Sequence, residues 1–139
     1  MPEPELPCRV RTLDHLVLTV ADIPETIQFY TRILGMRGTQ FAVADGSERW
    51  ALTFGKSKIN LHQKAREFDP KSANPTPGSA DLCFLTDAPI EVWSRHQTTQ
   101  GVVIEDGPVP RSGAAGPILS LYIRDPDGNL IEISVPKGP

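Results

Sequence analysis

The stretch of sequence that decides the fold is Leu13-Asp14-His15-Leu16-Val17-Leu18-Thr19-Val20, together with the residues that follow it. Its β-branched and apolar residues predict a strand. Asp22 is then positioned as a helix N-cap, with Glu25 three residues later, and Gly35 ends the helical spacing. Further strand patterns follow at residues 37–44, 49–54 and 58–63. The first half of the chain is therefore expected to fold as a strand, a helix and three strands.

The same order of elements begins again at Ala80. A strand pattern at 81–86 precedes a helix that starts at Pro89 and ends near Gly101. Later strand patterns lie at residues 102–104, 118–124 and 130–135. The segment 107–116, which is rich in Gly and Pro, is expected to be an irregular loop that borders a pocket. This internal repeat predicts an α+β fold in which two βαβββ modules form a cup-shaped, eight-stranded mixed sheet.

The repeat divides one domain, residues 1–139, into three parts. Module one spans about 12–64, a Pro- and Gly-rich linker about 65–78, and module two about 79–136. Each module is too small to bury its own sheet face, so the modules must pack together within one chain or between chains. Because symmetric pairs are the commonest oligomers, we expect a homodimer.

Composition narrows the class of partners. A net charge of −3 over 139 residues argues against a nucleic-acid surface. No apolar stretch is long enough to span a bilayer. The acidic, Pro-rich start at residues 1–7 does not resemble a secretory signal, and Cys8 and Cys83 are too few for a disulfide framework. We therefore expect a cytoplasmic protein whose partner is a small molecule, with no nucleic acid and no membrane.

Polar side chains interrupt strand faces that should line the cup. Because alternate residues share a face, His15, Asn60, His62, Asp81 and Glu132 are candidates to point into it. Buried carboxylates are costly unless they are paired or bound to a cation, so a divalent metal would satisfy them together. A single strand histidine or glutamate is more often an ordinary surface or core residue. The repeat favours a site, since it places His15 and Asp81, and Asn60 and Glu132, at equivalent positions.

The choice between Asn60 and His62 stays open at this point. His62 is the more usual ligand type, but it lies two residues beyond the symmetric position. It is either a ligand itself, or a residue that supports a ligand or contacts the substrate. The predicted metal ligands are His15, His62, Asp81 and Glu132, with Glu132 also the catalytic residue.

Several stretches of the chain match a known family. The runs His15–Val20, Phe29–Met36 and Asp125–Ile133 resemble vicinal-oxygen-chelate proteins, the glyoxalase, bleomycin-resistance and extradiol-dioxygenase superfamily. More specifically, Lys58–Gln63, Gly78–Phe84 and Gly107–Gly113 look like glyoxalase domain-containing protein 5 and its bacterial virulence-protein relatives. The resemblance covers nearly the whole chain and implies the glyoxalase-like fold.

The resemblance also implies a metal site on the first, fourth, fifth and eighth strands. Carried over by position, the ligands are His15, Asn60, Asp81 and Glu132. Glyoxalase I relatives usually have Glu or Gln at the Asn60 position, and His or Gln at the Asp81 position. The ligand set in this chain has harder donor atoms than theirs and favours Mn²⁺ or Fe²⁺ over Zn²⁺, with Ni²⁺ a further candidate.

The activity that the resemblance implies is that of a glyoxalase-like metalloenzyme of the lactoylglutathione-lyase type, acting on a small substrate with vicinal oxygens. The alternatives are an extradiol ring-cleaving dioxygenase of the biphenyl-2,3-diol type and a non-catalytic drug- or metabolite-binding resistance protein. Metal content separates the last of these from the two enzymes, and Fe²⁺ dependence separates the dioxygenase from the lyase.

Overall fold

The structure, a computed structural model, describes residues 6–138. The acidic start of the chain lies mostly outside this range. The elements follow one another in this order: β1 His15–Val20, α1 Ile23–Leu34, β2 Arg37–Ala42, β3 Glu48–Phe54, β4 Ser57–Gln63, β5 Asp81–Leu85, α2 Ile90–Thr99, β6 Asp106–Gly113, β7 Gly116–Arg124 and β8 Leu130–Pro136.

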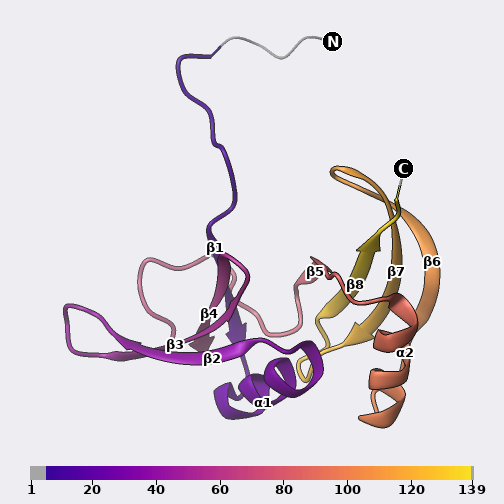
Figure 1. Cartoon of the computed structure of the whole chain (residues 1–139). Helices are drawn as coiled ribbons and strands as arrows, with labels where there is room; N and C mark the ends of the chain where they lie inside the picture. The colour runs from indigo at the N-terminus through magenta and orange to yellow at the C-terminus, as the bar shows by residue number, and fades with distance from the viewer. Residues whose placement is uncertain (1–5, 139) are drawn as a thin grey trace.

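The strands form two four-stranded sheets with the orders β1-β4-β3-β2 and β5-β8-β7-β6. In each sheet the first strand of the module runs parallel to the last, and the other neighbours are antiparallel. Figure 1 shows the first sheet in purple and the second in orange and yellow, with the linker passing between them. The prediction of an α+β fold built from two βαβββ modules is confirmed.

Strand β6 corrects one expectation. It occupies the Gly- and Pro-rich segment that was expected to be a loop, whereas residues 102–104 form no strand. Prolines are tolerated because β6 is the edge strand of its sheet, so the missing N–H groups remove few ladder hydrogen bonds. The pairing is irregular between Asp106 and Val109 and becomes regular from Val109, which lies opposite Ser120.

Helix α1 begins and ends where the sequence predicts. The side chain of Asp22 accepts a hydrogen bond from the backbone N–H of Glu25 at 2.9 Å, and Gly35 adopts the left-handed conformation that ends the helix. No helix of residues 6–138 is long and apolar enough to cross a membrane.

One apolar core joins the two modules. It contains the helix-side residues of both sheets, among them Leu18, Val20, Ile59, Leu61, Leu121, Ile123, Ile131 and Ile133. The rings of Phe54 and Phe84 meet edge to face across the module boundary, with centroids 5.3 Å apart. The hydroxyl of Tyr30 donates a 2.7 Å hydrogen bond to the carboxylate of Asp125 in the other module. Since side chains alternate, the opposite face of each sheet points away from this shared core.

Candidate functional site

The face of the first sheet that points away from the core carries the predicted polar residues. On β1, Leu18 and Val20 are buried, whereas His15 and Val17 are exposed. On β4, Asn60 lies opposite Val17, so it shares this face with His15. His62 lies opposite Thr19, four residues beyond His15 along the strand direction.

The second sheet repeats this arrangement. Asp81 and Cys83 are exposed on β5, and Glu132 on β8 lies opposite Cys83. The two pairs have the same geometry. Asn60 lies two residues beyond the position opposite His15 on the neighbouring parallel strand, and Glu132 lies two residues beyond the position opposite Asp81. Strand spacing puts the Cα atoms of each diagonal pair roughly 8 Å apart. That separation allows two side chains to converge on one ion.

The same strand spacing places His62 too far from His15 to share a site with it. Four residues along the strand and one strand across put its Cα roughly 14 Å from that of His15. Side chains on one sheet face stand nearly parallel, so His15 and His62 do not converge. Register therefore favours Asn60 over His62 as the neighbour of His15 in a common site.

The surroundings of His15 and Asn60 favour a role for both as metal ligands. The Nδ1 atom of exposed His15 lies 2.7 Å from a carboxylate oxygen of Asp14, which leaves the Nε2 atom free. The amide oxygen of Asn60 is buried and, within residues 6–138, has no hydrogen-bond partner. A buried oxygen without a partner is costly, so a cation beside it would remove an existing penalty.

Glu132 belongs to a hydrogen-bonded group on the second sheet. Its carboxylate accepts a 3.4 Å hydrogen bond from the hydroxyl of Ser134, which also lies 2.6 Å from that of Ser120 and 3.3 Å from the Sγ atom of Cys83. Burial is the main cause that raises the pKa of Cys83; the Ser134 hydrogen bond opposes the shift and the charge of Glu132 adds to it. The shift favours the protonated thiol.

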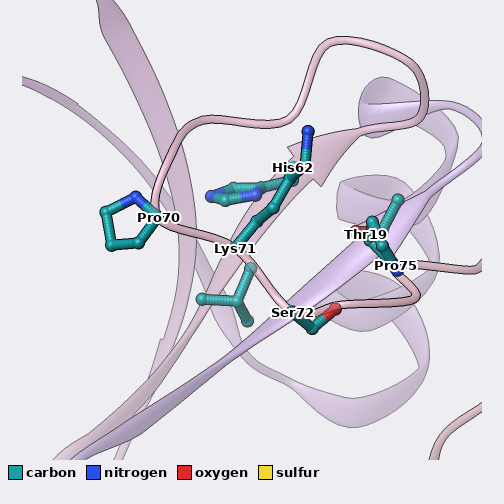
Figure 2. A pocket seen from close by; sticks show the side chains of 7 residues that line it. Thr19, His62, Pro70, Lys71, Ser72 and Pro75 are labelled. Carbon is teal, nitrogen blue, oxygen red and sulfur yellow. The ribbon is translucent and has the colours of Figure 1, made fainter.

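His62 instead lies in a pocket beneath the linker. This pocket, here called the linker pocket, has a volume of about 260 Å³. Its lining comes from the strand residues Val17, Thr19 and His62 and from the linker residues Pro70, Lys71, Ser72 and Pro75 (Figure 2). Burial, and next the charge of Arg49, lower the pKa of His62 and favour the neutral imidazole.

The linker residue Phe68 contacts His62 beside this pocket. Its ring meets that of His62 edge to face, and the guanidinium of Arg49 lies 3.4 Å above the same ring. The sequence alone did not identify Arg49, Phe68 or Lys71 as neighbours of His62. Alternation along β3 places Arg49 on the open face, but only the register shows it beside His62, and the linker has no periodicity to show where its side chains lie.

One chain does not bring the predicted ligands together. In the part of the chain from residue 6 to 138, no group of three or more His, Cys, Asp or Glu side chains is placed to hold a metal. No hydrogen bond or ion pair of these residues joins His15 or Asn60 to Asp81 or Glu132. The structure therefore leaves the candidate ligands as two pairs on different sheets, His15 with Asn60 and Asp81 with Glu132. These pairs are here called the half-sites of a candidate metal site.

Comparison with known proteins supplies the family. The sequence model of the Glyoxalase/Bleomycin resistance protein/Dioxygenase superfamily matches residues 12–133. The chain belongs to this superfamily. Its members bind small molecules, and divalent metals are common among them.

Relatives within the superfamily match almost the whole chain. The virulence protein STM3117 of Salmonella typhimurium is 56% identical over 122 residues, which are 88% of this chain and 82% of that protein. The glyoxalase domain-containing protein RDO1 of Mycosarcoma maydis is 55% identical over 125 residues, 90% of this chain and 68% of that protein. A solved structure from the mobile metagenome of V. Pseudocholerae is 53% identical, with a TM-score of 0.90 over 96% of this chain and 100% of that one. The resemblance stated from the sequence is confirmed.

More distant solved structures share the fold alone. TnmS3, an antibiotic-binding protein from Streptomyces, is 19% identical with a TM-score of 0.71, and covers 94% of this chain and 99% of its own. A lactoylglutathione lyase from Agrobacterium tumefaciens is 19% identical with a TM-score of 0.67, over 91% and 95%. The superfamily fold thus serves both binding and catalysis, and function must be argued from the site.

Proposed function

We propose that this chain is a metal-dependent enzyme of the glyoxalase type, which acts on a small substrate with two adjacent oxygens and works as a cytoplasmic homodimer. The observation that carries the proposal is the pair of half-sites, which have the same register on the open faces of the two sheets. Cys8 and Cys83 are free thiols, as is usual in a reducing compartment.

The position of the half-sites supports the proposed homodimer. Each is on a sheet face that points away from the shared core, next to exposed apolar side chains: Val17 is 45% exposed and Leu85 64% exposed. A second copy can lay the first-sheet face of one chain on the second-sheet face of the other. A two-fold axis then makes two such contacts and two complete sites, and it covers the exposed apolar residues.

The combined half-sites fit a divalent metal. They offer one imidazole nitrogen from His15, one amide oxygen from Asn60 and two carboxylates from Asp81 and Glu132. Oxygen-rich sets of this kind suit Mn²⁺ and Fe²⁺ better than Zn²⁺. The chemistry that a bound ion supplies is Lewis-acid stabilisation of negative charge on the substrate oxygens.

In this proposal the protein residues remove a proton from the substrate and hold the reacting side chains in position. Glu132 is the base that takes a proton from a substrate carbon beside the chelating oxygens, and Ser134 orients its carboxylate. Asp14 fixes the tautomer of His15. His62 contacts the substrate from the linker pocket, the role that the register favours.

Mixing two inactive variants tests whether the site is shared. His15→Ala and Glu132→Ala chains are unfolded, mixed in equal amounts and refolded together. If each site takes residues from two copies, half of the dimers are mixed and each has one intact site, so about a quarter of the wild-type metal sites and of the activity returns. If nothing returns, while each variant alone refolds to a dimer by light scattering, the shared site is refuted.

Metal titration tests the ligands and separates the alternatives. Glu132→Gln should lower Mn²⁺ affinity more than ten-fold while leaving the unfolding free energy nearly unchanged, because the substitution keeps the side-chain shape. The control Glu91→Gln removes the same charge from the exposed first turn of α2 and should bind Mn²⁺ like the wild type. Activity on catechols that requires Fe²⁺ would instead indicate a ring-cleaving dioxygenase. Tight binding of a drug with no metal dependence would indicate a resistance protein.

A further inference from the structure

The linker pocket opens on the same sheet face as the first half-site. Val17 lines the pocket and lies opposite Asn60 on β4. His62, also in the lining, is two residues beyond Asn60, or roughly 7 Å along the strand. A substrate held at Asn60 and His15 would therefore extend into the pocket.

Three polar residues of the pocket have hydrogen-bonding groups without a partner in the described part of the chain. Within residues 6–138, the hydroxyls of Thr19 and Ser72 and the ring nitrogens of His62 make no hydrogen bond to the protein. Figure 2 shows the long side chain of Lys71 reaching past His62, with Thr19 and Ser72 on the other side of the pocket. All four residues line the same pocket, and each can donate a hydrogen bond to an oxyanion bound there.

The charge of the pocket also favours an anion. Arg49 and Lys71 both place positive charge near the imidazole of His62, and the opposing effect of Glu67 is smaller than that of Arg49 but larger than that of Lys71. Lys71 has one acidic neighbour, Asp69, at 3.8 Å. Both side chains of that pair are exposed, so the pair is weak and leaves the ammonium available to a ligand.

We propose that the linker pocket binds a carboxylate of the substrate, which makes the substrate a small organic acid whose acid group lies apart from the two chelating oxygens. This inference rests on the proposed function for the position of those oxygens. Thr19, Ser72 and His62 donate hydrogen bonds to the carboxylate, and Lys71 supplies the positive charge. The volume of about 260 Å³ lies below the usual range for drug-sized ligands, so the substrate is small.

Calorimetry on the metal-free, chelator-treated protein tests the pocket without the metal site. The probes are acetate, malate and succinate, with acetamide and succinamide as neutral analogues of similar size. We expect saturable millimolar binding of malate or succinate, and at least about ten-fold weaker binding of succinamide, because the amide lacks the charge. Equal binding of succinate and succinamide, or no saturable binding of any of the three acids, would overturn the inference.

Two matched variants locate the binding. Lys71→Met should weaken succinate binding about ten-fold, whereas Lys56→Met, which removes the same charge from the β3–β4 turn, should leave it unchanged. Thr19→Val, which keeps the side-chain shape, should also weaken it. Equal effects of the two lysine variants would refute the pocket. Mn²⁺ affinity measured on Lys71→Met should equal that of the wild type, so that loss of acid binding and loss of the metal site can be told apart.

Discussion

The hydrogen bond between Tyr30 and Asp125 offers a direct measure of how firmly the two modules are joined. Tyr30 on α1 is fully buried, and Asp125 lies in the second module just after β7. The carboxylate accepts hydrogen bonds from the Tyr30 hydroxyl at 2.7 Å, from the Asn129 side chain at 2.8 Å, and from the backbone N–H groups of Asp127 and Asn129. Tyr30→Phe removes one of these four donors and leaves the ring in place.

The structure sets the size of the effect. A hydrogen bond to a charged group contributes roughly 1.5–3 kcal/mol, and the three remaining donors keep Asp125 from being left without partners. We therefore expect Tyr30→Phe to lower the free energy of unfolding by about 2 kcal/mol, or about 30-fold in the unfolding equilibrium.

The pH dependence of this contribution has a definite sign. Burial, followed by the charge of Asp125, raises the pKa of Tyr30 above that of an unfolded tyrosine. The unfolded chain loses the phenol proton above about pH 10 while the folded chain keeps it. The advantage of the wild type over Tyr30→Phe is thus complete below that pH and declines above it.

Urea unfolding at one fixed protein concentration measures the loss. Tyr122→Phe is the matched control, because it removes the same atom from a half-buried tyrosine whose hydroxyl accepts a hydrogen bond from Arg111. That variant should change stability by no more than about 0.5 kcal/mol. If Tyr30→Phe costs no more than Tyr122→Phe, the buried link between the modules does not stabilise the fold and the reasoning fails.

Two further predictions concern β6 and the first half-site. Gly107→Ala should destabilise the fold by more than about 2 kcal/mol in urea unfolding, because its Cβ would lie 2.4 Å from the backbone oxygen of Ser120 and the residue has a positive φ. Gly46→Ala, also at positive φ but with no atom within 4 Å of its Cβ, should cost only about 1 kcal/mol, and a larger loss there would contradict the steric argument. Asp14→Ala should weaken Mn²⁺ binding roughly ten-fold in a calorimetric titration, because His15 loses its orienting partner. Asp87→Ala, which removes another exposed carboxylate, should not weaken Mn²⁺ binding, and equal losses would mean that only overall charge matters.

Local patterns in the sequence were sufficient to predict the internal repeat and most boundaries of the helices and strands. Alternation along β1 and β8 and the caps of α1 depend on neighbouring residues, whose spacing is visible in the chain. For the same reason the sequence identified His15, Asp81 and Glu132 as polar interruptions of strand faces. It misjudged β6, because prolines discourage a strand unless it is known to lie at the edge of a sheet.

Pairing between distant segments of the chain decided which side chains lie together at the candidate site and how the two modules pack. The parallel register of β1 with β4 places Asn60 rather than His62 beside the position of His15, and no local pattern contains that register. The linker has no periodicity, so only the folded chain shows Phe68 against His62 and Lys71 in the pocket. The modules share a core on their helix sides because apolar faces must be buried together. That packing leaves the two pairs of candidate ligands on outward faces of different sheets, so the four residues of the proposed metal site do not meet within one chain.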